Sequence, residues 1–311
     1  MSDGPFPRDR ELTAIAIAYK NPTGGYIADK VLPRVPVGKR TFNWWEYDLE
    51  QSYQVVKTLV GERSKVPMVE LTGTRRESTC EDYGLDIPLT KSDIDEAPKG
   101  VDPKAQATEQ SADFVHLERE CNVATMCFNA ANYPSSQKAD LSGIGDTQFD
   151  DADADPLVYI AEKLDGCQVR PNKMVFGQPA WSKLRTHAKV VKACNGNDGG
   201  NGLAMRERIA ELLELDEILV GRSFYNSVKP GKTPVLARAW GKHALAFYCA
   251  PNVGTAGGMT FGYTATLGTF FGGFKAIDIG LLGGTAVRAG EIRKEIIAAP
   301  YAAFLFQNAV S

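Results

Sequence analysis

The alternation of apolar and polar residues is most regular between residues 102 and 133. Apolar residues recur there at steps of three and four, which predicts one long helix of about 45 Å at 1.5 Å per residue. Asp102 can cap this helix, Pro103 fits its first position, and Pro134 disfavours helical backbone at the residue before it. The predicted apolar stripe consists of Ala107, Phe114, Leu117, Cys121, Ala124, Phe128 and Ala131.

This stripe is built mostly from small and medium-sized side chains. A coiled coil requires repeated Leu or Ile at such positions, so the pattern favours a sheet or loops that lie across the helix. The opposite face is polar and carries Lys104, Glu109, Asp113, Glu120 and Asn122.

The beginning of the chain is apolar and extended. Residues 31–37 contain two prolines, which excludes a helix and predicts an extended segment at a surface or a sheet edge. We interpret residues 1–40 as an arm that lies on something else, such as another subunit.

The next pattern is a pair of extended segments. Residues 41–56 are rich in aromatic and β-branched side chains, and residues 69–81 begin with an apolar–polar alternation. A polar connection with Gly61 and Pro67 lies between them, so we predict a long hairpin over residues 41–82. Because a two-stranded ribbon is marginal alone, it needs a neighbour. The alternative, a strand pair within a larger mixed sheet, stays open.

The remaining elements follow a mixed pattern. Residues 83–100 are predicted to form a loop with one helical turn at 91–96, and the polar residues 135–155 mark a boundary. The second half has an α/β pattern and then becomes rich in strands and glycine. We predict helices at 156–166, 178–194 and 204–215, strands at 172–177, 217–221, 233–239, 244–248 and 286–297, and an apolar tail after Pro300.

Composition narrows the class of protein without naming a function. The chain has 311 residues, a net charge of -3, 43% hydrophobic and 23% charged residues, which is ordinary for a globular protein. Nothing suggests global attraction to nucleic acid or an anionic membrane. No apolar run approaches the roughly 20 residues of a membrane span, and the N-terminus is not a secretory signal. The six scattered cysteines lack CxxC spacing, which favours free thiols.

Two motifs partly match known ligand-binding loops, but each lacks a residue that the loop requires. Gly231–Thr233 spells GKT, but Asn226 stands where a phosphate loop needs glycine and Pro234 follows at once, so a surface turn is favoured. Four acidic residues match positions 1, 3, 5 and 12 of a calcium loop, but Pro156 occupies the position that requires glycine. An acidic linker with a helix cap is favoured for this set, which is Asp151, Asp153, Asp155 and Glu162.

Catalytic chemistry has no recognisable signature in this sequence. His116, His187 and His243 lack a second histidine at metal spacing, and no motif of a nucleophilic enzyme is present. We therefore predict no catalytic, metal-binding or cofactor-binding residue. The pair Trp44–Trp45 is interpreted as contact residues or as ribbon packing rather than as a ligand platform. The predicted contacts between subunits are Trp44, Trp45, Tyr47, Tyr53, Arg63, Arg75, Arg76 and Glu77.

The order of these segments resembles the major capsid protein of tailed double-stranded-DNA bacteriophages. The similarity is spread over nearly the whole chain and has no single signature. It is carried by LTAIAIAYKNPTGGYIADKVLPRVPVGKRTFNWWEYD, VELTGTRRESTCEDYGLDIPL, the helical stretch 102–133, NKMVFGQPAWSKLRTHAKVV, AWGKHALAFY and VRAGEIRKEIIAAPYAAFLFQNAV.

The resemblance implies an α+β fold in five parts. They are an N-terminal arm (1–40), an extended β-hairpin loop (41–82), a peripheral domain (83–150) on a spine helix (102–133), an axial α/β domain (151–258), and return strands with a C-terminal tail (259–311). We expect the strand at 286–297 to lie along the helix. The helix should pack through Phe114, Leu117, Cys121, Ala124 and Phe128.

The function implied is structural rather than enzymatic. Such a chain self-assembles into hexamers and pentamers of an icosahedral head that encloses the phage genome. Expected partners are a portal protein and a separate scaffolding protein, since no long extension precedes the arm, with decoration proteins left open. Contact with the packaged DNA would be weak and non-specific, and no membrane is involved. The expected location is the virion, assembled in the bacterial host cytoplasm.

Two other functions remain as alternatives. An encapsulin-like compartment shell shares the fold and encloses cargo enzymes. An α/β enzyme whose site escapes motif reading would bind a small molecule within residues 155–255.

Overall fold

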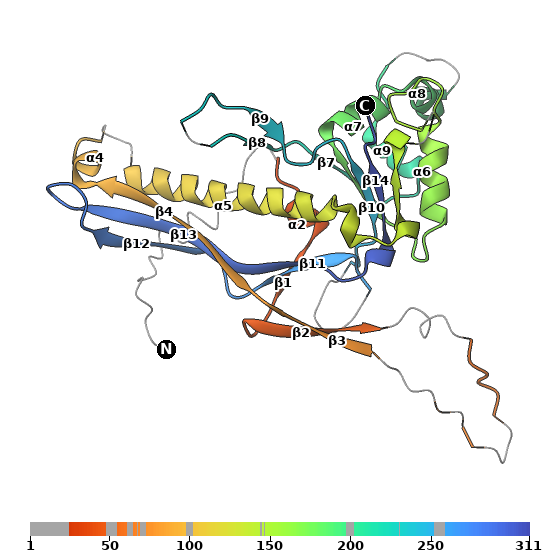
Figure 1. The fold of residues 1–311 in the computed structure, drawn as a ribbon, viewed down its shortest axis with the longest axis horizontal. Coiled ribbons are helices and arrows are strands. Elements are labelled where there is room, and N and C mark those ends of the chain that lie inside the picture. Colours follow the sequence, from red (N-terminus) through yellow and green to blue (C-terminus); the bar gives the residue numbers. More distant parts are fainter. Residues whose placement is uncertain are drawn as a thin grey trace.

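A computed structural model describes the chain at residues 25–47, 55–60, 65–66, 68, 73–97, 102–143, 145, 147–196, 202–229, 231–251 and 259–311. Figure 1 shows an elongated molecule with a long helix and flat strands at one end and a more compact α/β part at the other. The fold is therefore mixed α+β, as predicted.

One five-stranded sheet, which we call the elongated sheet, is centred on β13 (Gly284–Ile297). Antiparallel β4 (Glu81–Thr90) pairs with one edge of β13, while β12 (Phe271–Ile277) and β11 (Gly262–Thr266) share the other edge. β1 (Arg34–Pro36) completes the sheet in parallel with β11. The single long strand predicted at 286–297 is confirmed.

Helix α5 (Pro103–Cys127) lies along the β4–β13 surface of this sheet (Figure 1). The predicted start is confirmed, because the Asp102 carboxylate accepts a hydrogen bond from the Lys104 N–H and Pro103 is the first helical residue. The helix ends before the predicted Tyr133. The Asn129 and Asn132 side chains bond backbone groups there and compete with helical hydrogen bonds, leaving only a short turn, η1 (Ala130–Asn132).

The buried face of α5 differs from the predicted stripe. Phe114 is 54% exposed and is therefore not a packing residue within this chain, whereas Glu120, expected on the polar face, is fully buried. Leu117, Cys121 and Phe128 are half-buried. The buried face shares only Ala107 and Ala124 with the predicted stripe. It comprises Ala107, Thr108, Ser111, Ala112, Val115, Arg119, Glu120, Val123, Ala124 and Cys127.

The predicted arm includes residues that belong to the chain's own core. α2 (Ala28–Val31) and the following Leu32 are packed against α5, with Val31 and Leu32 completely or almost completely buried. β1 is extended as predicted, but its edge is paired with β11. Residues 27–37 therefore pack on the chain's own core, and residues 1–24 of the predicted arm lie outside the described residues.

The predicted loop at 83–100 is wrong in its first half. β4 runs continuously to Thr90, and its partner on the elongated sheet explains why. The missed signal was the alternation of Leu85, Ile87 and Leu89 with polar or small residues. The helical turn is confirmed as α4 (Lys91–Asp95), capped by reciprocal hydrogen bonds between Thr90 and Asp93.

The two strands of the predicted hairpin are confirmed as β2 (Thr41–Tyr47) and β3 (Gly73–Thr79). They pair antiparallel from Thr41 opposite Thr79 to Tyr47 opposite Gly73. In the part of the chain that the structure describes, they form a sheet of their own, which we call the ribbon, rather than part of a larger sheet.

The second five-stranded sheet, which we call the α/β sheet, has the order β5-β14-β10-β6-β7. The predicted strands near 172–177, 217–221 and 244–248 are confirmed. Its strands are β5 (Lys138–Asp140), β14 (Ala303–Gln307), β10 (Ala244–Phe247), β6 (Lys173–Gly177) and β7 (Glu217–Gly221), and its helices are α6 (Pro156–Asp165), α7 (Gln178–Leu184), α8 (Ala188–Asn195) and α9 (Arg206–Leu212).

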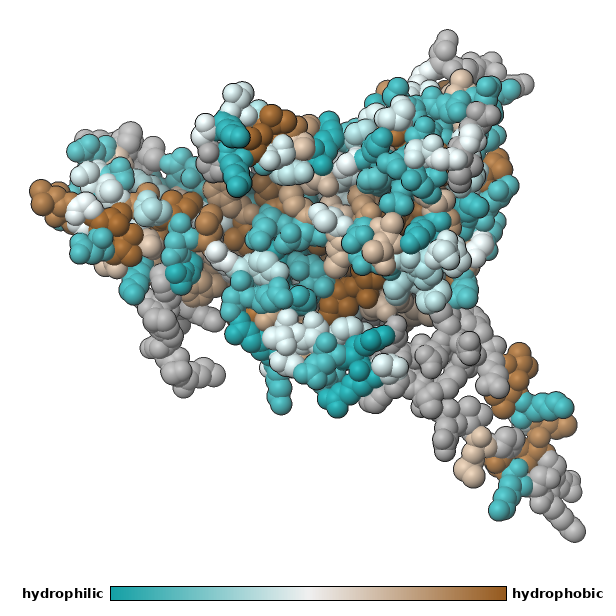
Figure 2. Space-filling model, viewed as in Figure 1, coloured by the Kyte–Doolittle hydropathy of each residue, from teal (hydrophilic) through white to brown (hydrophobic). Residues whose placement is uncertain are grey.

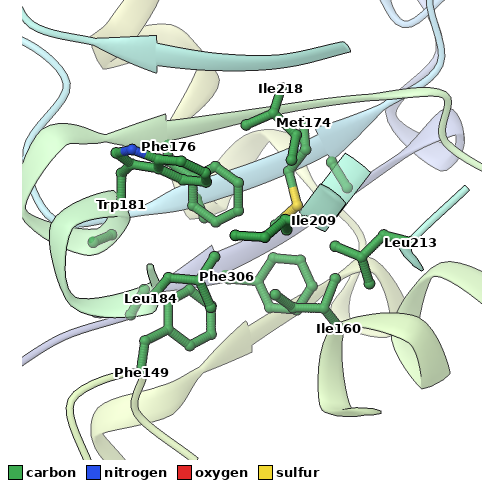
Figure 3. Packing of buried hydrophobic residues seen from close by; sticks show 14 of the residues in the cluster. Phe149, Ile160, Met174, Phe176, Trp181, Leu184, Ile209, Leu213, Ile218 and Phe306 are labelled. Atoms are coloured by element: carbon green, nitrogen blue, oxygen red, sulfur yellow. The ribbon is translucent and has the colours of Figure 1, made fainter. Parts of the chain in front are cut away.

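Two predictions for this part are wrong. The segment after Pro300 is no tail, because β14 is inserted between β5 and β10 and its apolar residues fill the core. The single helix at 178–194 is two helices, since the chain turns at residues 185–187 and α8 starts anew after His187. Figure 3 shows the resulting core, in which Phe149, Phe176 and Phe306 meet side chains from the helices.

Candidate assembly surfaces

The predicted contact residues lie along the ribbon. Trp44 is half-buried and stacks beside Phe42 at 6.0 Å between ring centroids, while Arg75, Arg76 and Glu77 are exposed on β3. The backbones of Trp45 and Tyr47 belong to β2, and Tyr53 and Arg63 lie outside the described residues. The structure of one chain thus brings the described members together on one element without showing what they contact.

Beyond the ribbon, the loop carries aliphatic side chains that the chain itself does not cover. Leu59 is 94% exposed, and Val55, Val66 and Met68 are also exposed. Figure 2 shows these apolar residues on an extension far from the body of the molecule. Contiguous apolar exposure of this kind marks an interaction site in a soluble protein.

Sequence reasoning missed two further exposed apolar elements. The turn between β12 and β13 presents Leu281, which is 100% exposed, and Leu282. The second element is a separate two-stranded sheet, the hairpin of β8 (Phe224–Asn226) and β9 (Leu236–Arg238), which carries exposed Phe224 and Leu236. The aliphatic dipeptides Leu281–Leu282 and Val235–Leu236 within turn-forming sequences were the available signals.

A buried carboxylate joins the parts that carry these surfaces. Glu120 of α5 accepts hydrogen bonds from the backbone N–H groups of Ile27 (3.0 Å) and Ala28 (2.8 Å), at the start of α2. It also accepts one from the indole N–H of Trp240 (2.5 Å), just before β10. Burial raises the pKa of Glu120, although these donors act in the opposite direction. The spine helix, the N-terminal segment and the α/β part therefore meet at one group.

A second cluster, in which Arg119, Glu291 and Arg293 are buried, links α5, α2, β1 and β13 through charges. Glu291 accepts from the Arg34 and Arg293 guanidinium groups, the latter at 2.9 Å, and Arg119 donates to Asp29 at 2.5 Å. Burial alone would raise the pKa of Glu291, but Arg34 and Arg293 outweigh it and lower the pKa. This cluster, which we call the β13 charge cluster, fixes the N-terminal segment on the elongated sheet.

The histidines and the GKT segment lie in contacts with the backbone and in a surface turn. The His187 ring lies 2.8 Å from the Asp151 carbonyl oxygen, and His243 Nδ1 accepts from the Asn308 N–H. Gly231 has a positive φ of 92° in the turn between β8 and β9, as a surface turn at GKT requires. Over the described ranges, no group of His, Cys, Asp or Glu is arranged to hold a metal ion. Asp155 is the N-cap of α6 by position, without a side-chain hydrogen bond.

Two further expectations from the sequence concern the cysteines and membrane-spanning helices. Burial raises the pKa of Cys127 and raises that of Cys167 to about 11, so these thiols are unreactive near neutral pH. The six cysteines are free. None of the helices that the structure describes combines the length and the apolar character needed to cross a bilayer.

Comparison with solved structures defines the class of fold. A phage-related protein from Bordetella bronchiseptica RB50 matches with a TM-score of 0.74 at 18% identity, covering 98% of this chain and 99% of that one. The capsid of cyanophage P-SCSP1u matches at 0.59 with 12% identity over 94% and 93%. A virus-like particle from Pyrococcus furiosus matches at 0.54 with 9% identity over 96% and 97%. The chain therefore has the fold of viral shell subunits.

Sequence relatives define the family. The major capsid protein of Pseudomonas phage JBD67 is 46% identical over 312 residues, covering 100% of both chains. That of Burkholderia phage BcepMu is 27% identical over 252 residues, 77% of this chain and 76% of its own length. No family model matches the sequence. The chain belongs to the major capsid proteins of tailed double-stranded-DNA phages.

Membership in this family confirms the resemblance and three general expectations. The chain is a structural protein, it associates with copies of itself, and it is part of the virion. The exposed surfaces described above are therefore candidates for contacts in a shell.

Proposed function

We propose that this chain assembles into hexamers and pentamers that close into an icosahedral head around double-stranded DNA. The observation that carries the proposal is the loop beyond the ribbon, whose aliphatic side chains are exposed far from the body (Figure 2). An apolar extension of this kind gains its burial only against another molecule. In a shell, that molecule is the next copy.

The proposal assigns a role to each part. The elongated sheet with α5 forms the peripheral domain and the α/β sheet forms the axial domain, now including β5 and β14. The ribbon and its loop bridge neighbouring copies through Trp44, Arg75, Arg76 and Glu77, together with Trp45, Tyr47, Tyr53 and Arg63. A head-to-tail contact of this kind closes into a ring when its rotation divides a full turn.

The same proposal includes partners other than copies of this chain. We infer a portal protein at one vertex, a separate scaffolding protein, and weak contact with DNA, consistent with a net charge of -3. Assembly takes place in the host cytoplasm, and the chain has no catalytic role. The compartment-shell alternative has a fold-level argument in the virus-like particle of Pyrococcus furiosus, but the 46% identical phage relative favours the phage head.

The test is electron microscopy of the protein produced in bacteria, alone and with its neighbouring phage genes. We expect closed shells from the full chain. A chain lacking residues 55–68 should fold, because the described residues of this segment are exposed and belong to neither five-stranded sheet, and should yield no stable shells. Normal shells from the deletion would remove the loop from the argument, and dispersed monomers of the full chain under every condition would contradict the function itself.

A further inference from the structure

The β8–β9 hairpin stands away from the body on the long side opposite the ribbon. Figure 1 shows it above α5, whereas β2 and β3 lie on the other side of the elongated sheet. Local hydrogen bonds hold its shape, since the Asn226 side-chain oxygen accepts from the Val228 (3.2 Å) and Val235 (3.1 Å) N–H groups. A two-stranded hairpin is marginal in water unless something covers it. Its sides are nevertheless open in the single chain.

The open surface combines an apolar centre with a cationic rim. Phe224, Val235 and Leu236 are exposed, Leu236 to 67%. Residues 222–238 contain four cationic residues and no Asp or Glu, and no described carboxylate forms an ion pair with any of them. The Arg238 guanidinium lies 4.2 Å from the Phe224 ring centroid. The cations are Arg222, Lys229, Lys232 and Arg238.

This surface selects a partner that is both apolar and acidic. The exposed Val235 and Leu236 side chains favour a protein partner, because aliphatic groups gain from burial against other apolar groups and not against phosphates. Opposite charges around an apolar centre steer association and fix its register, while like charges facing each other cost several kcal/mol.

The chain itself contains a segment of this chemistry at the end of β2. Residues 46–56, which lead from β2 into the loop, carry Glu46, Asp48 and Glu50 and no Lys or Arg. They also carry five apolar or aromatic residues, of which Val55 is exposed. Because β2, which precedes most of this segment, and the hairpin lie on opposite sides of the molecule, we assign the contact to two different copies (Figure 1).

A head-to-tail ring places one side of each copy against the opposite side of the next. We propose that the β8–β9 hairpin of one subunit is the docking surface for residues 46–56 of a second copy of this chain. This inference rests on the proposed assembly into rings and names the surface that receives the loop. The contact joins three carboxylates and four cations around Leu236 and Val235.

The test is a charge exchange. The variant Lys229→Glu/Lys232→Glu should fold, because both side chains are exposed and unpaired among the described residues, and its melting temperature and circular dichroism should match the parent protein. Its yield of shells should fall on the order of tenfold or more, because carboxylates then face carboxylates. Adding Glu46→Lys/Asp48→Lys to the same chain should restore shells.

A matched control uses acidic residues elsewhere on the surface. Asp95→Lys/Glu96→Lys at the exposed end of α4, at the far end of the molecule, should not restore shells in the hairpin variant. If the hairpin variant misfolds, Lys229→Gln/Lys232→Gln serves instead, with a smaller loss of shells that 0.5 M salt in the parent protein should mimic, since salt screens exposed charges.

Several results would overturn the inference. They are normal shells from the hairpin variant, rescue by the α4 exchange instead of the loop exchange, and failure of the loop exchange to rescue a folded variant. Loss of binding to a double-stranded DNA oligonucleotide with unchanged assembly would assign the hairpin to nucleic acid and likewise overturn it. Absence of shells from the parent protein would contradict the proposed function, which is a distinguishable outcome.

Discussion

The elongated sheet and the α/β sheet have five strands each and bury different chemistry. The α/β sheet encloses large apolar side chains such as Phe149, Phe176 and Phe306. The face of α5 against the elongated sheet is made of small residues and charges, and the buried charged residues that the structure describes, Arg119, Glu120, Glu291 and Arg293, all lie on α5 or β13.

The difference in buried side chains follows from the shapes of the two parts. A compact α/β unit encloses enough volume for large side chains, whereas a thin layer of one helix on one sheet does not, so close approach requires Ala, Ser and Thr. Charged pairs then give this layer directional contacts at defined positions. Some large apolar side chains of the elongated part, such as Phe114 and Leu281, stay exposed.

Removing a large side chain from the α/β core should have the largest effect. Phe306→Ala should lower the free energy of unfolding by about 3–5 kcal/mol, since it leaves a cavity beside Phe304 and Tyr159. The matched control is Phe114→Ala, the same substitution at an exposed site of α5, with a change within about 0.5 kcal/mol. Urea unfolding measures both, and equal losses would contradict the corrected face of the helix.

Removing the Glu120 carboxylate, which joins the two parts, should have the second-largest effect on stability. Glu120→Ala leaves the N–H groups of Ile27, Ala28 and Trp240 without their acceptor and should cost about 3 kcal/mol. Hydrogen exchange at Ile27 and Ala28 should accelerate. Glu109→Ala, at an exposed site on the same helix, should change neither the free energy of unfolding nor the hydrogen exchange. Equal effects of the two variants would show that the contacts of Glu120 do not stabilise the fold.

The smallest expected effect is a pH dependence of folding stability that comes from Glu291 in the elongated sheet. The pKa of Glu291 is lowered in the fold below its ordinary value of 4.5, so near and below that pH the unfolded chain binds more protons than the folded one. The stability from Glu291 is present above pH 4.5 and is lost as pH falls through the folded pKa.

The variant Glu291→Gln should cost about 2 kcal/mol at pH 7, because Arg34 and Arg293 each lose one of their charged partners. Its stability should then decrease less than that of the parent protein on acidification from pH 6 to 3.5. Unfolding titrations across this range provide the check, with Glu109→Gln as control. A parent-like pH slope in Glu291→Gln would indicate that the β13 charge cluster does not respond to acid.

The elements with strong local signals were predictable from sequence. The Asp102–Pro103 cap, the strand pair around residues 41–47 and 73–79, and β13 were each specified by capping chemistry or β propensity within a few residues. The family was also recognisable, because the order of segments survives where single motifs do not. The site candidates on the ribbon remain predictions, since one chain does not show its neighbours.

Other features depend on partners distant in sequence. The buried face of α5 was misread because Glu120 is stabilised by donors from Ile27, Ala28 and Trp240, which no helical periodicity contains. β4 was read as a loop because its hydrogen-bond partner is almost two hundred residues away on β13.

The sequence by itself determined where the long helix starts, which strands form the ribbon, and that the chain is a shell protein, because these depend on local propensities and on the order of segments. Only the tertiary structure decided which side of the helix is buried, that the segment after Pro300 is an inner strand, and that the N-terminal residues 27–37 belong to the core. The physical reason is the same in each case: a side chain's burial depends on what the rest of the chain brings against it.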